Sequence, residues 1–277
     1  MVWQTFGHTN IKNILNKQLG SGVFPHAYLF SGSSELGKKS LALELARKIL
    51  NTEKLENHPD FQVLDADGEI VMEQVLDFIG KIGYKPFFGT KKVAIINNAQ
   101  NLNIQSSNAL LKTLEEPSPS SIIILISSST GLLPTIVSRC QVLNFNLFSQ
   151  AGLKQFDQEF NLQASPEMLE ASFGRSGRLK KFAQDKDFFL KEKGVIEEYQ
   201  KITSQPLGEK LSRLADLAEL EEASLTQNLL SWLFWQTENL AHQPGDFFRV
   251  QALIDALSGL KNNQNKKLVL QSLFMKI

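Results

Sequence analysis

The sequence AYLFSGSSELGKKS at residues 27–40 decides the fold. Its first four residues are apolar or aromatic, as in a short buried strand, and the spacing of apolar residues from Lys38 onward predicts a helix over 38–50. Between them Gly32, Gly37 and Lys38 form the pattern G-x-x-x-x-G-K. A loop of this kind directs backbone N–H groups at phosphates, which its lysine also reaches. The stretch therefore predicts the framework of a phosphate-binding P-loop.

The position after Lys38 departs from the pattern of an active loop. A Ser or Thr hydroxyl is needed there to bind Mg²⁺, whereas Lys39 offers an ammonium group that repels a cation. Ser40 lies about 100° further round the helix, and Glu35 adds negative charge inside the loop. We therefore expect a vestigial nucleotide site that binds little or no Mg-ATP.

A second departure follows the apolar run at residues 93–96. A hydrolytic P-loop enzyme needs an Asp at the end of such a strand to hold Mg²⁺, and commonly an adjacent Glu that polarises water. Asn97 and Asn98 occupy these positions. Because an amide is no general base and a poor ligand for a hard cation, the sequence predicts little or no ATP hydrolysis.

The apolar pattern divides the chain into an α/β part and an all-helical part. Strands are predicted at residues 27–30, 61–64, 93–96, 122–126 and 142–145, and helices between them at 38–50, 71–82 and 105–116. Strands that alternate with helices predict a parallel, doubly wound sheet. Later helical patterns lie at 153–160, 166–173, 178–183, 194–203, 207–218 and 225–241. With a break at 204–206, we expect domains at 1–146, 147–203 and 204–277.

Composition and charge describe an ordinary globular chain. It has 277 residues, 42% of them apolar, with 29 Lys+Arg and 29 Asp+Glu, so charge gives no argument for independent nucleic-acid binding. The single cysteine, Cys140, excludes an internal disulfide and a zinc site with several thiolates. Four scattered histidines show no metal-ligand spacing. Without a signal peptide or a membrane-length apolar run, we expect a cytoplasmic protein that holds no metal.

Two further motifs are more specific: SSNALLKTLEEP at residues 106–117 and Ser138-Arg139-Cys140. Together with PHAYLFSG at 25–32, HPD at 58–60 and LPTIVSRCQ at 133–141, they resemble the clamp-loader AAA+ family of bacterial DNA polymerase III. The likeness covers roughly residues 3–180. It implies a RecA-like AAA+ domain, a helical lid and a C-terminal helical collar.

Within that family, the active gamma/tau subunits carry intact nucleotide motifs and normally a cysteine cluster after the first helix. Residues 51–57 of this chain contain no cysteine. Corrupted nucleotide motifs beside a retained Ser-Arg-Cys motif therefore resemble the delta-prime members of the family.

The resemblance assigns the main functional role to Arg139. In the family, the Ser-Arg-Cys arginine is offered to ATP on the neighbouring subunit, where a guanidinium stabilises charge on the γ-phosphate. Ser138 and Cys140 complete the motif. Without the family, an arginine before a strand is usually a surface charge.

Other implied positions are less specific. Ser127 and Ser128, followed by Ser129, occupy the place of the family's γ-phosphate sensor, although they could simply cap a strand. Arg178 lies in a segment that resembles the lid region with the second sensor. The register of that segment is ambiguous, because the expected arginine could match Gly177.

The resemblance, together with the altered nucleotide motifs, implies a catalytically silent clamp-loader subunit of the DNA polymerase III holoenzyme. It would need no cofactor, since ATP is bound by the neighbour. Its partners would be gamma/tau, delta, the sliding clamp and, through the complex, primer-template DNA, with no membrane. One alternative is an autonomous ATPase that holds Mg²⁺ with Ser40 and Asp65 or Asp67; others are an active gamma/tau-like subunit and a nucleic-acid-binding adaptor.

Overall fold

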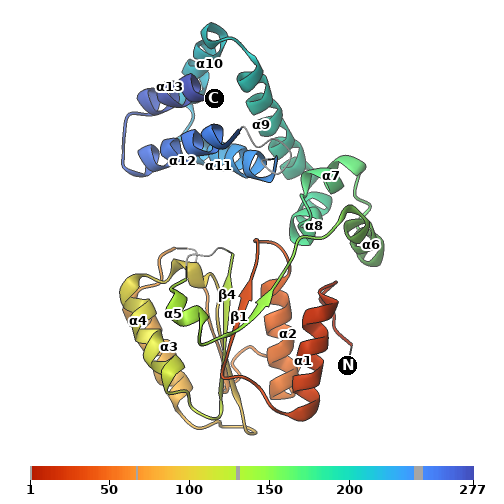
Figure 1. Cartoon of the computed structure of the whole chain (residues 1–277). Helices are drawn as coiled ribbons and strands as arrows, with labels where there is room; N and C mark the ends of the chain where they lie inside the picture. The colour runs from red at the N-terminus through yellow and green to blue at the C-terminus, as the bar shows by residue number, and fades with distance from the viewer. Residues whose placement is uncertain (1, 67, 129–131, 240–245) are drawn as a thin grey trace. The chain divides into compact units, whose positions relative to one another are not determined.

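A computed structural model of the chain describes residues 2–66, 68–128, 132–239 and 246–277 (Figure 1). It divides into two compact units. Unit 1 comprises Met1–Ser165 with Gly174–Lys180, and unit 2 comprises Pro166–Phe173 with Lys181–Ile277. The predicted boundaries at 146/147 and 203/204 stay predictions.

Unit 1 is built on a five-stranded parallel sheet with the order β2-β3-β4-β1-β5. The strands are β1 (Ala27–Ser31), β2 (Phe61–Leu64), β3 (Lys92–Ile96), β4 (Ser121–Ser127) and β5 (Gln141–Asn144). They match the five predicted apolar runs within two residues at each end. The prediction of a parallel, doubly wound sheet is confirmed.

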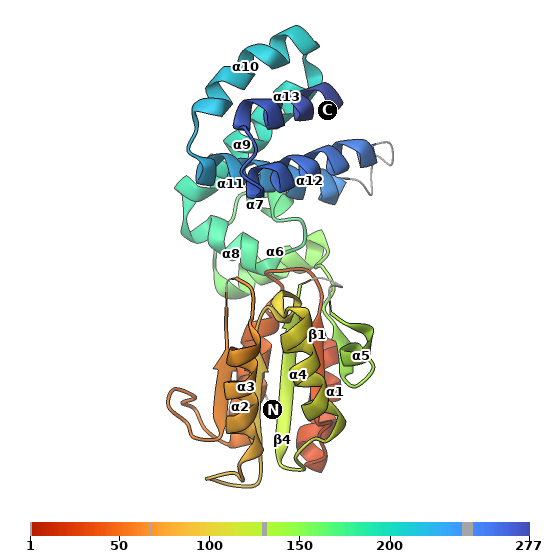
Figure 2. The ribbon, with the colours of Figure 1, turned by 90° about the vertical axis from the view of Figure 1, so that its left-hand side faces the viewer.

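Helices cover both faces of this sheet. The helices of unit 1 are α1 (Thr9–Ser21), α2 (Lys38–Leu50), α3 (Met72–Gly83), α4 (Ile104–Glu115), the short α5 (Pro134–Val137), α6 (Gln150–Phe160) and the start of α8 (Ser176–Gln184), with a 3₁₀ turn, η1 (Ala99–Asn101). In Figure 1, α1 and α2 lie on one face, and α3 and α4 lie on the other. Figure 2 looks onto α3 and α4, with strands behind them.

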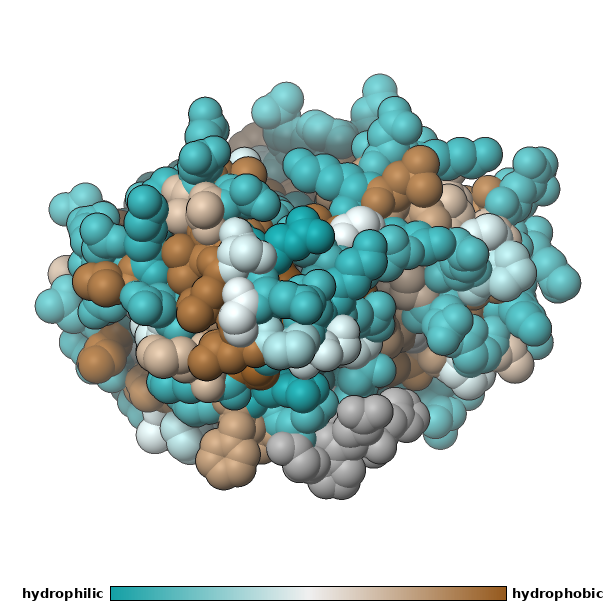
Figure 3. All heavy atoms as spheres, turned by 90° about the horizontal axis from the view of Figure 1, so that it is seen from above, coloured by the Kyte–Doolittle hydropathy of each residue, from teal (hydrophilic) through white to brown (hydrophobic). Residues whose placement is uncertain are grey.

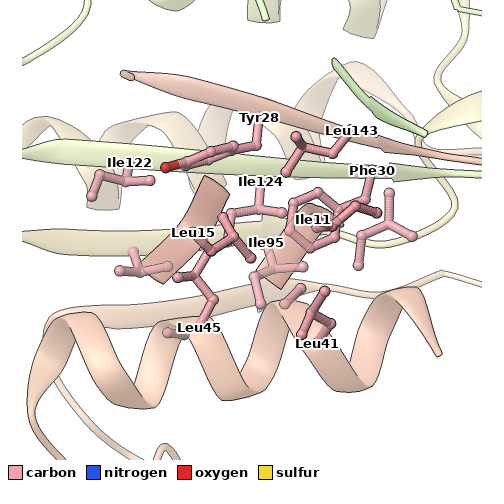
Figure 4. Close-up of a cluster of buried hydrophobic side chains, with 14 of the residues drawn as sticks. Ile11, Leu15, Tyr28, Phe30, Leu41, Leu45, Ile95, Ile122, Ile124 and Leu143 are labelled. Atoms are coloured by element: carbon pink, nitrogen blue, oxygen red, sulfur yellow. The ribbon is translucent and has the colours of Figure 1, made fainter. Parts of the chain in front are cut away.

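Alternate residues of β1 supply the two cores. Tyr28 and Phe30 are fully buried in the cluster that contains α1 and α2, next to residues such as Leu15 and Leu45 (Figure 4). Leu29 belongs to the opposite cluster, with α3 and α4. This alternation is the period of two expected for a strand buried on both faces. Parallel pairing with β4 and β5 sets the direction of β1 and hence the end of the sheet at which the following loop lies.

The His-Pro-Asp motif has a structural role in the loop before β3. The Asp60 side chain is only 2% exposed, and its two oxygens accept the backbone N–H groups of Phe87 and Phe88, each at 2.6 Å. A buried carboxylate needs such donors. Asp60 therefore fixes a loop whose two phenylalanine rings remain exposed.

Unit 2 is entirely helical among its described residues. It contains α7 (Pro166–Ala171), the end of α8, α9 (Lys186–Ser204), α10 (Leu207–Glu219), α11 (Glu222–Asn239), α12 (Phe247–Lys261) and α13 (Lys266–Lys276). The helical pattern predicted after residue 146 is confirmed in the described ranges, although α9 begins eight residues before the predicted 194. The last two residues of the helix predicted at 225–241 lie outside them.

The core of unit 2 surrounds Trp232, whose side chain is fully buried. Its ring stacks on Tyr199 with centroids 5.2 Å apart, and its indole N–H donates to the Val195 carbonyl at 2.8 Å. Helix α9 thus shares a core with α11. Figure 3 shows one face of the molecule, on which hydrophilic residues separate smaller hydrophobic groups. Over the described ranges, no helix is both long enough and apolar enough to cross a bilayer.

Candidate functional site

The P-loop leaves the carboxyl end of β1 and enters α2. Gly32 has a φ of 141°, and a Cβ atom added there would lie 2.2 Å from the Phe145 carbonyl oxygen, so the position requires glycine. Gly37, with a φ of 83°, directly precedes the first residue of α2. In parallel sheets, ligands bind at the carboxyl edge of the strands. The loop is therefore placed where a nucleotide site belongs.

Lys38 points back into its own loop. Its side chain is 6% exposed, and its ammonium group donates to the carbonyl oxygens of Gly32, at 2.6 Å, and Ser33. Burial, and after it the positive charge of Arg175, lower the pKa of Lys38 from its ordinary 10.5 to about 8. The residue that would bind phosphate instead ties together the loop.

The segment Gly174–Lys180 packs against this loop within unit 1. The Gly177 N–H donates to the Glu35 carbonyl at 2.8 Å, and a Cβ added at Gly177 would lie 2.8 Å from the same oxygen. Arg175, which is 5% exposed, is the arginine whose charge acts on Lys38. Sequence reasoning gave Arg175 no role, although it is the first arginine of the lid-like segment. Arg178 lies half-buried in α8, and its sensor role stays a prediction.

Lys39 forms an ion pair with Asp65, which follows β2. The other Asp65 oxygen accepts the Asn97 side-chain N–H at 2.7 Å. These hydrogen bonds, first from Lys39 and then from Asn97, lower the pKa of the Asp65 carboxyl. An ammonium and an amide thus engage the carboxylate that the autonomous-ATPase alternative assigned to Mg²⁺.

The autonomous-ATPase alternative also needs Ser40 close to Asp65, and the structure does not bring them together. Ser40 is exposed and lines a separate pocket of about 410 Å³ beside Thr5 and Glu44. There the Glu44 carboxylate accepts the backbone N–H groups of Gln4 and Thr5. Asp67 lies outside the described residues. Within the described ranges, no group of three or more His, Cys, Asp or Glu residues is placed to hold a metal ion.

Amides connect the loops that follow the neighbouring strands. The Asn98 side chain donates to the Ala66 carbonyl at 3.2 Å, and the Gln100 side chain accepts the Ser128 backbone N–H at 3.2 Å. Ser127 is the buried last residue of β4, and Ser129 lies outside the described residues. This set of amides and hydroxyls can fix loops, but it includes no base to activate water.

The two specific sequence motifs meet at Arg139. One of its terminal nitrogens donates to the Thr135 carbonyl at 2.9 Å, and the other donates to the Glu115 carboxylate at 2.8 Å. The side chains of Arg139 and Glu115 are 34% and 49% exposed. The Ser138 hydroxyl also donates to the Thr135 carbonyl, at 3.1 Å. Burial raises the pKa of the Cys140 thiol to about 12, so this cysteine packs as an unreactive apolar residue.

Arg139 and the P-loop lie at opposite ends of the parallel strands. Gln141 pairs with Tyr28, and Asn144 pairs with Ser31, so Arg139 precedes the amino end of β5 whereas Gly32 follows the carboxyl end of β1. The paired part of β1 alone separates these levels by roughly 10 Å. Arg139 is therefore placed away from a phosphate held by its own loop.

The buried lysine should make stability depend on pH. Between about pH 8 and 10.5, the unfolded chain keeps the Lys38 proton and the folded chain releases it, so the contribution of Lys38 to stability rises with pH. Across this window the free energy of unfolding of the native chain should rise relative to that of a Lys38→Met variant, on the order of 2–3 kcal/mol. Urea unfolding of both chains at pH 7.5 and 10 measures the change. A constant difference in free energy of unfolding would contradict it.

Comparison with known proteins finds relatives among DNA polymerase III subunits. The chain is 35% identical over 141 residues to the DNA polymerase III subunit delta' of Pseudomonas aeruginosa, covering 44% of this chain and 43% of the relative. It is 30% identical over 175 residues to the subunit delta' of Bacillus subtilis, covering 57% and 53%. The chain thus spans about half the length of these relatives.

A solved structure supports the fold. The DNA polymerase III gamma subunit-related protein of Thermotoga maritima superposes with a TM-score of 0.55 at 18% identity, over 96% of this chain and 97% of that one. The resemblance to delta-prime members of the clamp-loader family, read from the sequence, is confirmed. The family model described as "DNA polymerase III, delta subunit" matches residues 7–149. Since this match covers more than half of the 277 residues, the chain belongs to that family.

Proposed function

We propose that the chain is a delta-prime-like subunit of the bacterial clamp loader, which helps to load the sliding clamp on primed DNA in the cytoplasm. It has little or no ATPase activity of its own and requires no cofactor. Polymerisation belongs to other chains of the holoenzyme. The proposed partners are the gamma/tau and delta subunits, the sliding clamp and, through the complex, primer-template DNA.

The observation that carries this proposal is the separation of Arg139 from the P-loop of its own chain. A half-exposed guanidinium at the amino edge of the sheet can serve a nucleotide only if another chain brings one to it. At the carboxyl edge, Lys39 and Asn97 already engage Asp65. One chain thus combines a silent nucleotide site with an arginine available to a neighbour.

This arrangement disfavours the autonomous-ATPase and active gamma/tau-like alternatives. Both need a divalent cation between the loop and an acidic strand end. Here Lys39 brings a positive charge to that place, and Asn97 and Asn98 supply no carboxylate. The intact Lys38 does not compensate, because it is folded back onto Gly32 and Ser33.

Reconstitution tests the proposal directly. The full chain, carrying a tag, should co-elute with gamma/tau and delta subunits of its own organism, and the isolated chain should not hydrolyse Mg-ATP above background. Recovery of the chain alone, or saturable Mg-ATP hydrolysis by the isolated chain that Lys38→Ala abolishes, would overturn it. Recovery of those partners from the native cytosol by pull-down is the matching test.

A further inference from the structure

The ion pair of Glu115 and Arg139 joins the two motifs that identify the chain, although 24 positions separate them in sequence. Glu115 is the last residue of α4, and Arg139 follows the short helix α5. A Glu115 oxygen accepts a guanidinium N–H at 2.8 Å, and the Thr135 carbonyl accepts another at 2.9 Å. The guanidinium is thus held from two directions.

This contact uses only part of the guanidinium. Arginine carries five N–H donors in a rigid planar arrangement, and two of them are used by the contacts with Glu115 and Thr135. The side chain remains 34% exposed. The donors that remain can therefore bind a phosphate oxygen while the other two still fix the plane of the group.

Stability does not explain the pair. Both side chains are partly exposed, and ion pairs of this kind contribute little to folding. A flexible arginine loses considerable rotamer freedom when it binds, however, and an arginine already fixed in place loses less. A contact that orients the guanidinium therefore affects how well it binds a ligand more than it affects the stability of the fold.

We propose that Glu115 is a positioning residue for Arg139: it holds the guanidinium in the plane and direction in which it meets the γ-phosphate of ATP on the neighbouring subunit. This inference rests on the proposed function, because it presupposes that Arg139 acts in trans. It gives the first glutamate of the Leu-Glu-Glu-Pro sequence a specific task, and assigns none to the second.

The chain offers a matched control in Glu116. It is an exposed glutamate directly next to Glu115, so Glu115→Ala and Glu116→Ala change the net charge equally and at nearly the same place. Glu115→Gln keeps a carbonyl oxygen that can accept the arginine N–H. The experiment compares these variants with Arg139→Ala and the double variant Glu115→Ala/Arg139→Ala in the reconstituted complex, with clamp and primed DNA.

We expect Glu115→Ala to lower kcat for ATP about three- to tenfold with KM nearly unchanged, because orientation matters most in the transition state. Glu115→Gln should recover most of the loss, and Glu116→Ala should match the native complex. The double variant should be no slower than Arg139→Ala alone, since the two residues act as one unit.

The possible failures are distinguishable. If Arg139→Ala leaves turnover unchanged, the trans role fails and the inference fails with it. If Arg139→Ala slows turnover while Glu115→Ala equals Glu116→Ala, the proposed function stands and the positioning role of Glu115 is overturned. Equal defects in assembly for both glutamate variants would also overturn it, because the effect would then be one of charge.

Discussion

Replacing Arg139 by alanine is expected to reduce ATP turnover at the neighbouring subunit's site at least about tenfold, while the complex still assembles. In related phosphoryl-transfer enzymes, an arginine that acts in trans on a γ-phosphate raises kcat by a factor of about 10³–10⁵. Other ATP sites in the complex would make the fall in total turnover smaller. The side chain hydrogen-bonds to the Thr135 carbonyl and the Glu115 carboxylate and is 34% exposed, so its removal should not disturb the fold.

Steady-state ATPase rates at saturating ATP measure this effect, and size-exclusion chromatography of the same samples measures assembly. Arg139→Lys is the matched variant, because it keeps the charge but loses the planar set of donors that fits two phosphate oxygens. It should therefore remain clearly impaired. Native turnover in Arg139→Ala would refute the trans role, and loss of assembly in both variants would point to an interface contact instead.

The sheet was predictable because its strands are buried on both faces. Runs such as 122–126 consist of consecutive apolar residues, and all residues of β4 are buried. Helix α1 was missed because its pattern is weak: its buried residues are Ile11 and Leu15, and polar side chains fill most other positions. Its contribution to the core depends on α2 and β1, which local sequence does not reveal.

The replacements in the nucleotide motifs could also be identified from the sequence, because they change chemical groups at fixed positions of a motif. What the sequence did not reveal is how the replacements are accommodated. Lys39 and Asp65 are 26 positions apart, and only the parallel sheet brings their loops together. The same holds for Arg175 beside Lys38 and for Glu115 beside Arg139: each residue is ordinary by itself, and the tertiary fold supplies its partner.

Trp232→Ala should have the largest effect on stability, lowering the free energy of unfolding of unit 2 by about 3–5 kcal/mol. The side chain is fully buried, so alanine would leave a large cavity between α9 and α11. It would also remove the stacking on Tyr199, at 5.2 Å, and leave the Val195 carbonyl without its indole donor. Full burial of Trp232 places it in the core of unit 2.

Trp235→Ala is the matched control, because Trp235 lies three residues later on the same helix but is only half-buried. Its ring meets Tyr199 edge-on at 5.9 Å, so a smaller loss, about 1–2 kcal/mol, is expected. Urea unfolding of each variant, followed by circular dichroism, measures both losses. Equal midpoints for native and Trp232→Ala chains would contradict the packing argument. If Trp235→Ala instead abolished assembly with gamma/tau while its unfolding stayed native, Trp235 would be an interface residue, and the collar role expected for this region would gain its first named contact.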